Sequence, residues 1–170
     1  MVKKVPHWAD IAASEIIKLK GNKNVVATGI TPSGPIHLGN LREILTGDAL
    51  ARALRDKGSE VHFIYIADTF DPLRKVYPFL PESYSEHVGK PISEIPDPDG
   101  CHENYAEHFL EPFLGAIKVL GIEPQVIKAH ESYKKGLYTE IIDLTLENNQ
   151  KITEILNEIA GRNLEKDFVP

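Results

Sequence analysis

The spacing of apolar residues predicts a strand, a helix and a second strand in the first part of the chain. Residues 24–30 are apolar without alternation, which is typical of a strand covered on both faces. Over residues 38–57 the apolar positions recur at helical spacing, and Gly58 follows as a C-terminal cap. A β-branched and aromatic run over residues 61–67 indicates the second strand. Together they predict a βαβ unit over residues 24–67, with parallel strands and a right-handed crossover.

Helical spacing continues on both sides of this unit. Before it, residues 8–20 predict an amphipathic helix that ends at Gly21. After residue 100 the pattern predicts a helix from near His102 to Leu120 that Pro112 kinks or restarts, a strand over residues 124–129, and a long helix over residues 137–160 that breaks near Asn148 and is capped by Gly161. Three strands with helices between them predict an α/β protein with a Rossmann-like, HUP-type parallel sheet.

Between residues 68 and 100 no periodic pattern continues. Half of the 12 prolines of the chain fall in this stretch. A loop of this length inside a compact domain is unusual unless it is functional. We therefore expect a Pro-rich excursion over residues 68–108 that lies above the sheet and has little hydrophobic core of its own.

A loop rich in glycine and proline, residues 28–40, connects the first strand to the helix. Ligands of open parallel sheets bind beyond the carboxyl ends of the strands, so this loop and Asp68 should share one crevice. Glycine lets the backbone approach a ligand, and free amides at a helix start favour an anion. His37 would add a side-chain donor beside those amides. The loop therefore predicts a phosphate-binding site.

Composition narrows the class of protein. The net charge of −6 argues against a chain that coats nucleic acid. No apolar run reaches the roughly 18 residues that a membrane span needs, so we expect no membrane contact. The only cysteine is Cys101, which rules out an internal disulfide and suits a reducing, cytoplasmic location.

Cys101 lies in a cluster of potential metal ligands. Cys101 and His108 are seven positions apart, so a helix would place them on one face, two turns apart. Asp97 and His102 could close around the ion from the preceding turn. One thiolate, two imidazoles and one carboxylate can complete a tetrahedral Zn²⁺ site with no open position, which would be structural. The alternative is a helix start capped by Asp99, with both histidines in solvent.

The loop also carries a motif. Residues 32–40 resemble the HIGH signature of the class I aminoacyl-tRNA synthetases, with His37-Leu38-Gly39-Asn40 in the place of the tetrad. Further segments are similar to one subgroup: His7-Trp8-Ala9-Asp10, Gly29-Ile30-Thr31-Pro32-Ser33-Gly34, Ala53-Leu54-Arg55-Asp56-Lys57-Gly58, Asp71-Pro72-Leu73-Arg74-Lys75-Val76 and Gly100-Cys101-His102-Glu103. Over nearly its whole length the chain resembles the N-terminal part of a class I lysyl-tRNA synthetase, the form found mostly in archaea and some bacteria.

This resemblance implies the first half of a class I catalytic domain. The implied reaction joins lysine to ATP, with Mg²⁺, as lysyl-adenylate and then transfers lysine to tRNA(Lys). The implied sites are lysine binding by Gly29, Thr31 and Asp68, ATP binding by Thr31, Pro32, Ser33, His37, Gly39 and Asn40, catalysis by His37 and Asn40, and zinc binding by Asp97, Cys101, His102 and His108.

Some residues near these sites have no assigned role. The family often has a second acid directly after Asp68, where this chain has Thr69. Asp71, Arg74 and Lys75 either reach the ATP phosphates or the acceptor end of tRNA, or form a solvated loop. His130 follows the third strand and is unassigned.

The second signature of the family, KMSKS, does not occur in these 170 residues. We expect residues 1–170 to be a partial catalytic domain, with the nucleotide-binding unit at 24–67, the excursion at 68–108 and a helix–strand–helix segment at 109–161. The rest of the catalytic domain and the anticodon-binding domain would be absent. Such a fragment should not aminoacylate tRNA alone, and a second polypeptide could complete its active site. Two alternatives are a small single-domain nucleotidylyltransferase, which uses a related H-x-G-H loop, and a non-catalytic synthetase-like binding module.

Overall fold

A computed structural model describes residues 5–165, 168 and 169. The chain divides into two compact units, Met1–His130 and Glu131–Pro170. The first unit contains the sheet and every predicted site residue.

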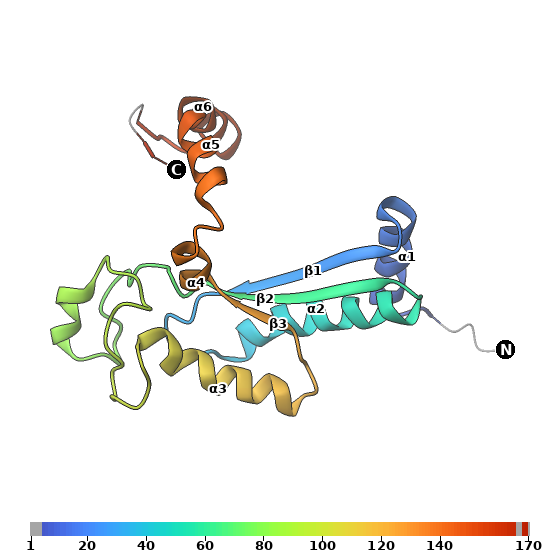
Figure 1. The fold of residues 1–170 in the computed structure, drawn as a ribbon, viewed down its shortest axis with the longest axis horizontal. Helices are drawn as coiled ribbons and strands as arrows, with labels where there is room; N and C mark the ends of the chain where they lie inside the picture. The colour runs from blue at the N-terminus through green and yellow to red at the C-terminus, as the bar shows by residue number, and fades with distance from the viewer. Residues whose placement is uncertain (1–4, 166–167, 170) are drawn as a thin grey trace. The chain divides into compact units, whose positions relative to one another are not determined.

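The first unit is built on a three-stranded parallel sheet in the order β1-β2-β3 (Figure 1). Its strands are β1 (Lys23–Ile30), β2 (Glu60–Ala67) and β3 (Gln125–Lys128). Ile30 pairs with Ala67, and Ala67 pairs with Lys128, so all three strands end at the same edge of the sheet. The predicted α/β class and the parallel βαβ unit are confirmed.

The helices α1 (Trp8–Lys20), α2 (Leu38–Asp56) and α3 (Tyr105–Val119) share the core of this sheet. Gly47 lets α2 lie close to the strands, because a Cβ atom there would be only 2.6 Å from Thr28 Cγ2. From α3, Leu110 and Phe113 enter the same core. The predicted helix over residues 8–20 is confirmed, and α2 ends within one residue of the predicted boundary.

Helix α3 differs from its prediction in two ways. It begins at Tyr105 rather than near His102, because the Asn104 side chain caps it by accepting the Glu107 amide. It also runs through Pro112 as one helix, so no second helix starts there. Cys101 therefore precedes the helix, and the prediction that Cys101 and His108 share a helical face is wrong.

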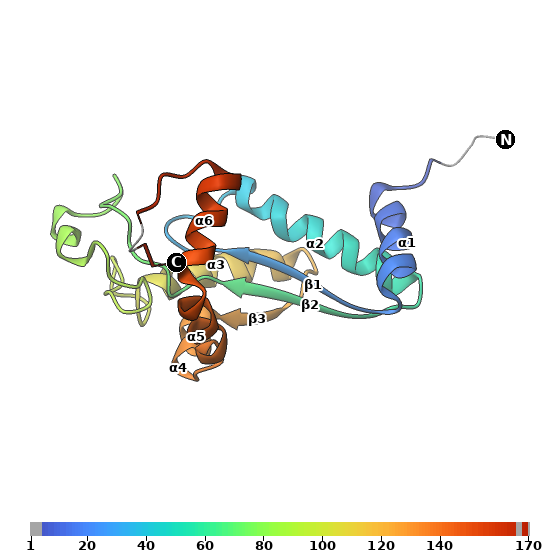
Figure 2. The same cartoon turned by 90° about the horizontal axis from the view of Figure 1, so that it is seen from above.

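The Pro-rich excursion lies beyond the carboxyl ends of β1 and β2, with α1 at the opposite end of the strands (Figures 1 and 2). Its only regular element among the described residues 68–104 is the short 3₁₀ helix η1 (Glu82–His87). The expectation of little core is wrong, because a second hydrophobic cluster joins the excursion to α3. Its buried members are Leu73, Leu80, Tyr84, Ile92, Ile95, Tyr105, Ala106 and Phe109.

The chain then forms α4 (Ala129–Lys134), which the sequence pattern did not predict. In the second unit, α5 (Thr139–Glu147) and α6 (Asn149–Ala160) replace the predicted long helix. The break falls at Asn148 as predicted, and Gly161 caps α6 with a left-handed φ of 61°. Among the described residues, no helix is both long and apolar enough to cross a membrane.

Candidate functional site

His37 is the N-cap of α2, at the end of the glycine- and proline-rich loop. Its Nδ1 accepts the Gly39 amide at 3.0 Å, and Asn40 Oδ1 accepts the His37 amide at 3.4 Å, which is a capping box. Because Nδ1 is the acceptor, the neutral ring carries its proton on Nε2. Both residues thus keep an outward donor, Nε2–H on His37 and the side-chain NH₂ group on Asn40.

Gly39 has a specific steric reason to be glycine. A Cβ atom there would lie 2.8 Å from Cε1 of His37, so Gly39 leaves space for the imidazole ring. The prediction of free amides at this helix start is wrong for Gly39, whose amide already bonds to His37. The amides of Asn40 and Leu41 bond to the His37 carbonyl at 2.9 and 3.1 Å. The side chains of His37 and Asn40 remain as donors for an anion.

A polar pocket of about 230 Å³ opens beside these two side chains. It brings together four of the predicted ATP-binding residues: Thr31, Ser33, His37 and Asn40. The aromatic side chains of Tyr77 and Phe79 complete its wall from the Pro-rich excursion. Their rings are parallel, with centroids 5.6 Å apart.

The other two predicted ATP residues lie elsewhere. The Pro32 side chain is fully buried. Gly39 lines a second hollow of about 490 Å³, between β1 and α2. Sequence reasoning missed Tyr77 and Phe79, because they lie in a segment with no periodic pattern.

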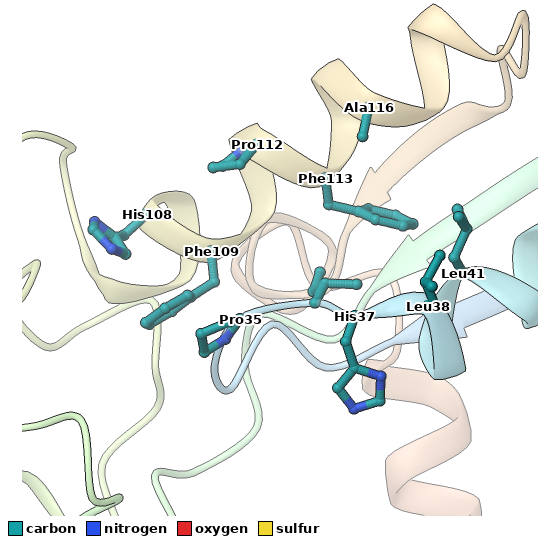
Figure 3. Close-up of a pocket in the computed structure, with 10 residues that line it drawn as sticks. Pro35, His37, Leu38, Leu41, His108, Phe109, Pro112, Phe113 and Ala116 are labelled. Atoms are coloured by element: carbon teal, nitrogen blue, oxygen red, sulfur yellow. The ribbon is translucent and has the colours of Figure 1, made fainter.

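A larger apolar cleft of about 660 Å³ separates the start of α2 from α3. Leu38, Leu41, Phe109 and Phe113 lie along it. His37 also lines it, with its imidazole ring turned away from α3 (Figure 3). The imidazole is therefore not directed at this apolar cleft, whose walls offer little to a phosphate.

Three carboxylates gather at the carboxyl end of β1. Glu43 Oε1 accepts the Gly29 amide at 2.9 Å, and Asp71 Oδ2 accepts the Thr31 hydroxyl at 2.7 Å. Asp68 Oδ2 lies 3.6 Å from the position that a Cβ on Gly29 would take. The three predicted lysine-binding residues therefore lie together, as the shared-crevice argument requires.

The electrostatics of this group favour a cation. Partial burial raises the pKa of Asp68, and the nearby Asp71 and Glu43 raise it further. An ammonium group placed there would relieve this repulsion. No sequence pattern indicated that Glu43 belongs to this group. Its contact with Gly29 depends on which side of α2 faces the end of β1.

The Thr69 side chain points into the protein. It is fully buried, and its Oγ1 lies 2.7 Å from His130 Nδ1 and accepts the His130 amide at 3.2 Å. The contact thus joins the second residue after β2, Thr69, to the second residue after β3, His130. The predicted basic residues of the excursion are exposed: Arg74 lies at the surface, and Lys75 Nζ is 5.7 Å from the centre of the Tyr77 ring.

The predicted metal ligands converge. Ligand atoms of Asp97, Cys101, His102 and His108 all lie within 4.8 Å of one another. Cys101 Sγ is 3.0 Å from His102 Nδ1 and 3.4 Å from His108 Nδ1. The two Asp97 oxygens lie 3.1 Å from His102 Nδ1 and 3.0 Å from His108 Nδ1. Ligand atoms around a tetrahedral zinc ion are separated by about 3.3–3.6 Å. One of these four separations lies within that range and three lie slightly below it, so the four side chains could hold a metal ion.

The surroundings of the cluster match a metal site as well. The far nitrogens of the histidines face carboxylates, His102 Nε2 at 2.8 Å from Glu111 and His108 Nε2 at 3.7 Å from Asp99. Metal-binding histidines usually have such partners. Burial alone would raise the pKa of Asp97, but amides of Asp99 and His102, the thiol and His108 hold that pKa well below its usual range. Asp97 is therefore a carboxylate at neutral pH.

Comparison of the sequence with known proteins shows which protein family the chain belongs to. The family model described as "tRNA synthetases class I (K)" matches residues 6–170. The chain belongs to the class I lysyl-tRNA synthetase family. It is 60% identical over 164 residues to a lysine–tRNA ligase of Methanosarcina barkeri (strain Fusaro), and 51% identical over 164 residues to that of Archaeoglobus fulgidus. A lysine–tRNA ligase of Thermoplasma acidophilum is 45% identical over 163 residues.

Each of these matches covers 96% of the chain but only 30%, 33% and 31% of the respective relatives. The chain thus spans about a third of the length of the lysyl-tRNA synthetases that it matches. Family membership favours the synthetase over the small nucleotidylyltransferase that the sequence left open.

Proposed function

We propose that the loop of residues 29–40, together with Asp68, forms one side of a lysyl-adenylate site. The protein that contains it would activate lysine with ATP and Mg²⁺ and transfer the lysine to tRNA(Lys). The observation that carries this proposal is the polar pocket, where Thr31, Ser33, His37 and Asn40 meet. This pocket adjoins the carboxylates at the end of β1 in a chain whose relatives are lysine–tRNA ligases.

The proposed chemistry is positioning and charge stabilisation. The lysine carboxylate attacks the α-phosphorus of ATP, the bond to the β-phosphate oxygen breaks, and pyrophosphate leaves. Negative charge grows on the α-phosphate oxygens during this step. The outward Nε2–H of His37 and the NH₂ group of Asn40 are donors that can stabilise it without rearrangement.

Lysine recognition would use the carboxylates. Because the Thr31 hydroxyl donates to Asp71, its oxygen is available to accept a hydrogen bond from an ammonium group. Asp68 would supply the opposite charge beside Gly29, whose missing side chain leaves room for the amino acid. Binding of the ammonium would then lower the pKa of Asp68 from its raised value.

The remaining groups of the site would come from residues beyond these 170 or from a second polypeptide, since the relatives are about three times as long. Within the chain we propose three parts of a catalytic domain: the nucleotide-binding unit at 24–67, the metal-binding excursion at 68–108, and the helix–strand–helix segment at 109–161. A role in tRNA aminoacylation also fits the cytoplasm.

We further propose that Asp97, Cys101, His102 and His108 hold a structural zinc ion. Zinc would cross-link the end of the excursion to the first turn of α3, where His108 lies. With four protein ligands it would have no open position for substrate.

Removal of one ligand should abolish metal binding. Cys101→Ser and His108→Asn are expected to reduce the zinc content from one equivalent to near zero, measured by elemental analysis after dialysis. His62→Asn is the matched control, because His62 is an exposed histidine on β2. Equal zinc content in all three variants would contradict the assignment.

The activity can be tested in a chimaera. This chain replaces the matching segment of the M. barkeri lysine–tRNA ligase, and lysine-dependent ATP–pyrophosphate exchange is measured. The chimaera should be active, and His37→Ala should lower its kcat by about a hundredfold or more. A folded, metal-loaded chimaera without exchange, or with a preference for another amino acid, would contradict the proposal.

A further inference from the structure

One hydrogen bond connects the start of α3, between the proposed metal ligands His102 and His108, to the proposed ATP loop. The Tyr105 hydroxyl donates to the Ser33 carbonyl at 2.7 Å, across 72 positions of sequence. Tyr105 is fully buried, and burial raises its pKa, so the hydroxyl keeps its proton and remains a donor. Ser33 lines the polar pocket with His37. The bond therefore fixes a peptide group in the wall of that pocket.

On the loop side, the contacts around this bond come largely from the residues after β2. Phe79 packs against Gly34 so closely that a Cβ on Gly34 would lie 2.9 Å from its ring. Thr31 is held by Asp71 at 2.7 Å. The Phe79 ring in turn packs edge-on against Phe109 of α3, with centroids 5.6 Å apart. The position of the loop thus depends on the excursion and on α3.

On the metal side, Tyr105 lies between two of the proposed ligands. It is three positions after His102 and three before His108, and it is the first residue of α3. Its amide donates to the Ile95 carbonyl at 3.1 Å, two positions before Asp97. Ligands on both sides of Tyr105 would therefore set the start of α3, and with it the direction of the tyrosine side chain.

We propose that Tyr105 is a positioning residue. Through it, the order of the loop at residues 33–37 depends on whether a zinc ion occupies the four proposed ligands. The inference rests on the proposed zinc and ATP sites but goes beyond them. In this inference the structural ion also shapes the nucleotide pocket. An ion that only cross-linked the excursion to α3 would have no effect on the loop. A tyrosine that merely fills the core would show no such dependence.

Hydrogen exchange tests this without any substrate. Amide exchange is followed by mass spectrometry in the chain with a chelator and with one equivalent of Zn²⁺. In the unchanged chain, zinc should slow exchange at Ser33, Gly34, Ile36 and His37 by about fivefold, the effect of one typical hydrogen bond. In Tyr105→Phe, zinc should bind equally well and still protect residues 92–108, but no longer protect the loop.

Tyr84→Phe is the matched control. Tyr84 belongs to the same hydrophobic cluster, and its hydroxyl also donates to a carbonyl, that of Pro96 at 2.8 Å, but this partner lies in the excursion. Zinc should still protect the loop in this variant.

Three results with the unchanged chain and Tyr105→Phe would overturn the inference: no zinc binding, zinc binding without loop protection in the unchanged chain, or equal loop protection in Tyr105→Phe. Loss of loop protection in zinc-loaded Tyr84→Phe would also overturn it, because the effect would not be specific to the Ser33 bond. An active chimaera combined with an uncoupled loop would refute this inference and leave the proposed function standing.

Discussion

Gly47 offers a quantitative test of the packing that positions the proposed site. It lies inside α2, the helix that His37 caps. An added methyl group would lie 2.6 Å from Thr28 Cγ2 and 3.0 Å from the Phe63 ring. Both neighbours belong to the sheet and lie in a closely packed region, so α2 must move away from β1 to accommodate it. Overpacking of this kind costs about 1–3 kcal/mol, against a gain of up to about 1 kcal/mol from helix propensity.

Gly115→Ala is the control, because Gly115 is also inside a helix but has no atom within 4 Å of its added Cβ. That variant should gain about 0.5–1 kcal/mol. The propensity gain is common to both variants, so they should differ by the overpacking cost of about 1–3 kcal/mol, or about 2–12 °C in Tm for a chain of this size. Thermal unfolding can be followed by fluorescence of Trp8, the single tryptophan, which lies in the first unit. If Gly47→Ala proved as stable as Gly115→Ala, the close contact between α2 and the sheet would be refuted.

Two further predictions concern titratable groups near the sheet edge. Among the described residues, the buried Tyr65 hydroxyl has no hydrogen-bond partner, so Tyr65→Phe should raise the free energy of unfolding in urea by about 1 kcal/mol; a clear loss would show that the hydroxyl has a partner. The pKa of Asp68 is raised in the folded protein, so ionisation of this carboxyl group opposes folding. The protonated group's contribution to the free energy of unfolding is fully present below about pH 4 and is lost as the pH rises through the pKa of the folded state. Asp68→Asn should therefore raise Tm at pH 7 but not at pH 3, and an equal effect at both pH values would contradict the raised pKa.

The regular part of the fold could be predicted because its sequence carries a period. Residues 24–67 change from an apolar strand pattern to a helical pattern and back, and the resulting βαβ unit requires its two strands to end at one edge. From that constraint alone, Gly29 and Asp68 could be predicted to lie close together, as they do in the structure.

The excursion could not be predicted in the same way. Its core residues, among them Leu73, Leu80, Ile92 and Ile95, follow no helical or strand spacing and find their partners on α3. The four side chains predicted as metal ligands do lie close together, but the local structure predicted for them is wrong, since Asn104 starts the helix after Cys101.

Contacts between side chains on separate elements were also beyond the sequence. The Nδ1 atom of His37 could have faced a ligand, but it caps α2 instead, and nothing in the motif indicates which nitrogen is used. The contact between Glu43 and Gly29 depends on how α2 lies against β1, which periodicity describes only to within a turn.

The central claim is that residues 29–40 and 68–71 form one crevice for lysyl-adenylate. The most direct measurement is a titration of the zinc-loaded chain with a non-hydrolysable lysyl-adenylate analogue, followed residue by residue through backbone amide chemical shifts. We predict saturable shifts concentrated at these two segments, with Thr31, His37 and Asp68 among them. Shifts confined to residues 139–160, or none at millimolar analogue in the folded chain, would contradict the claim.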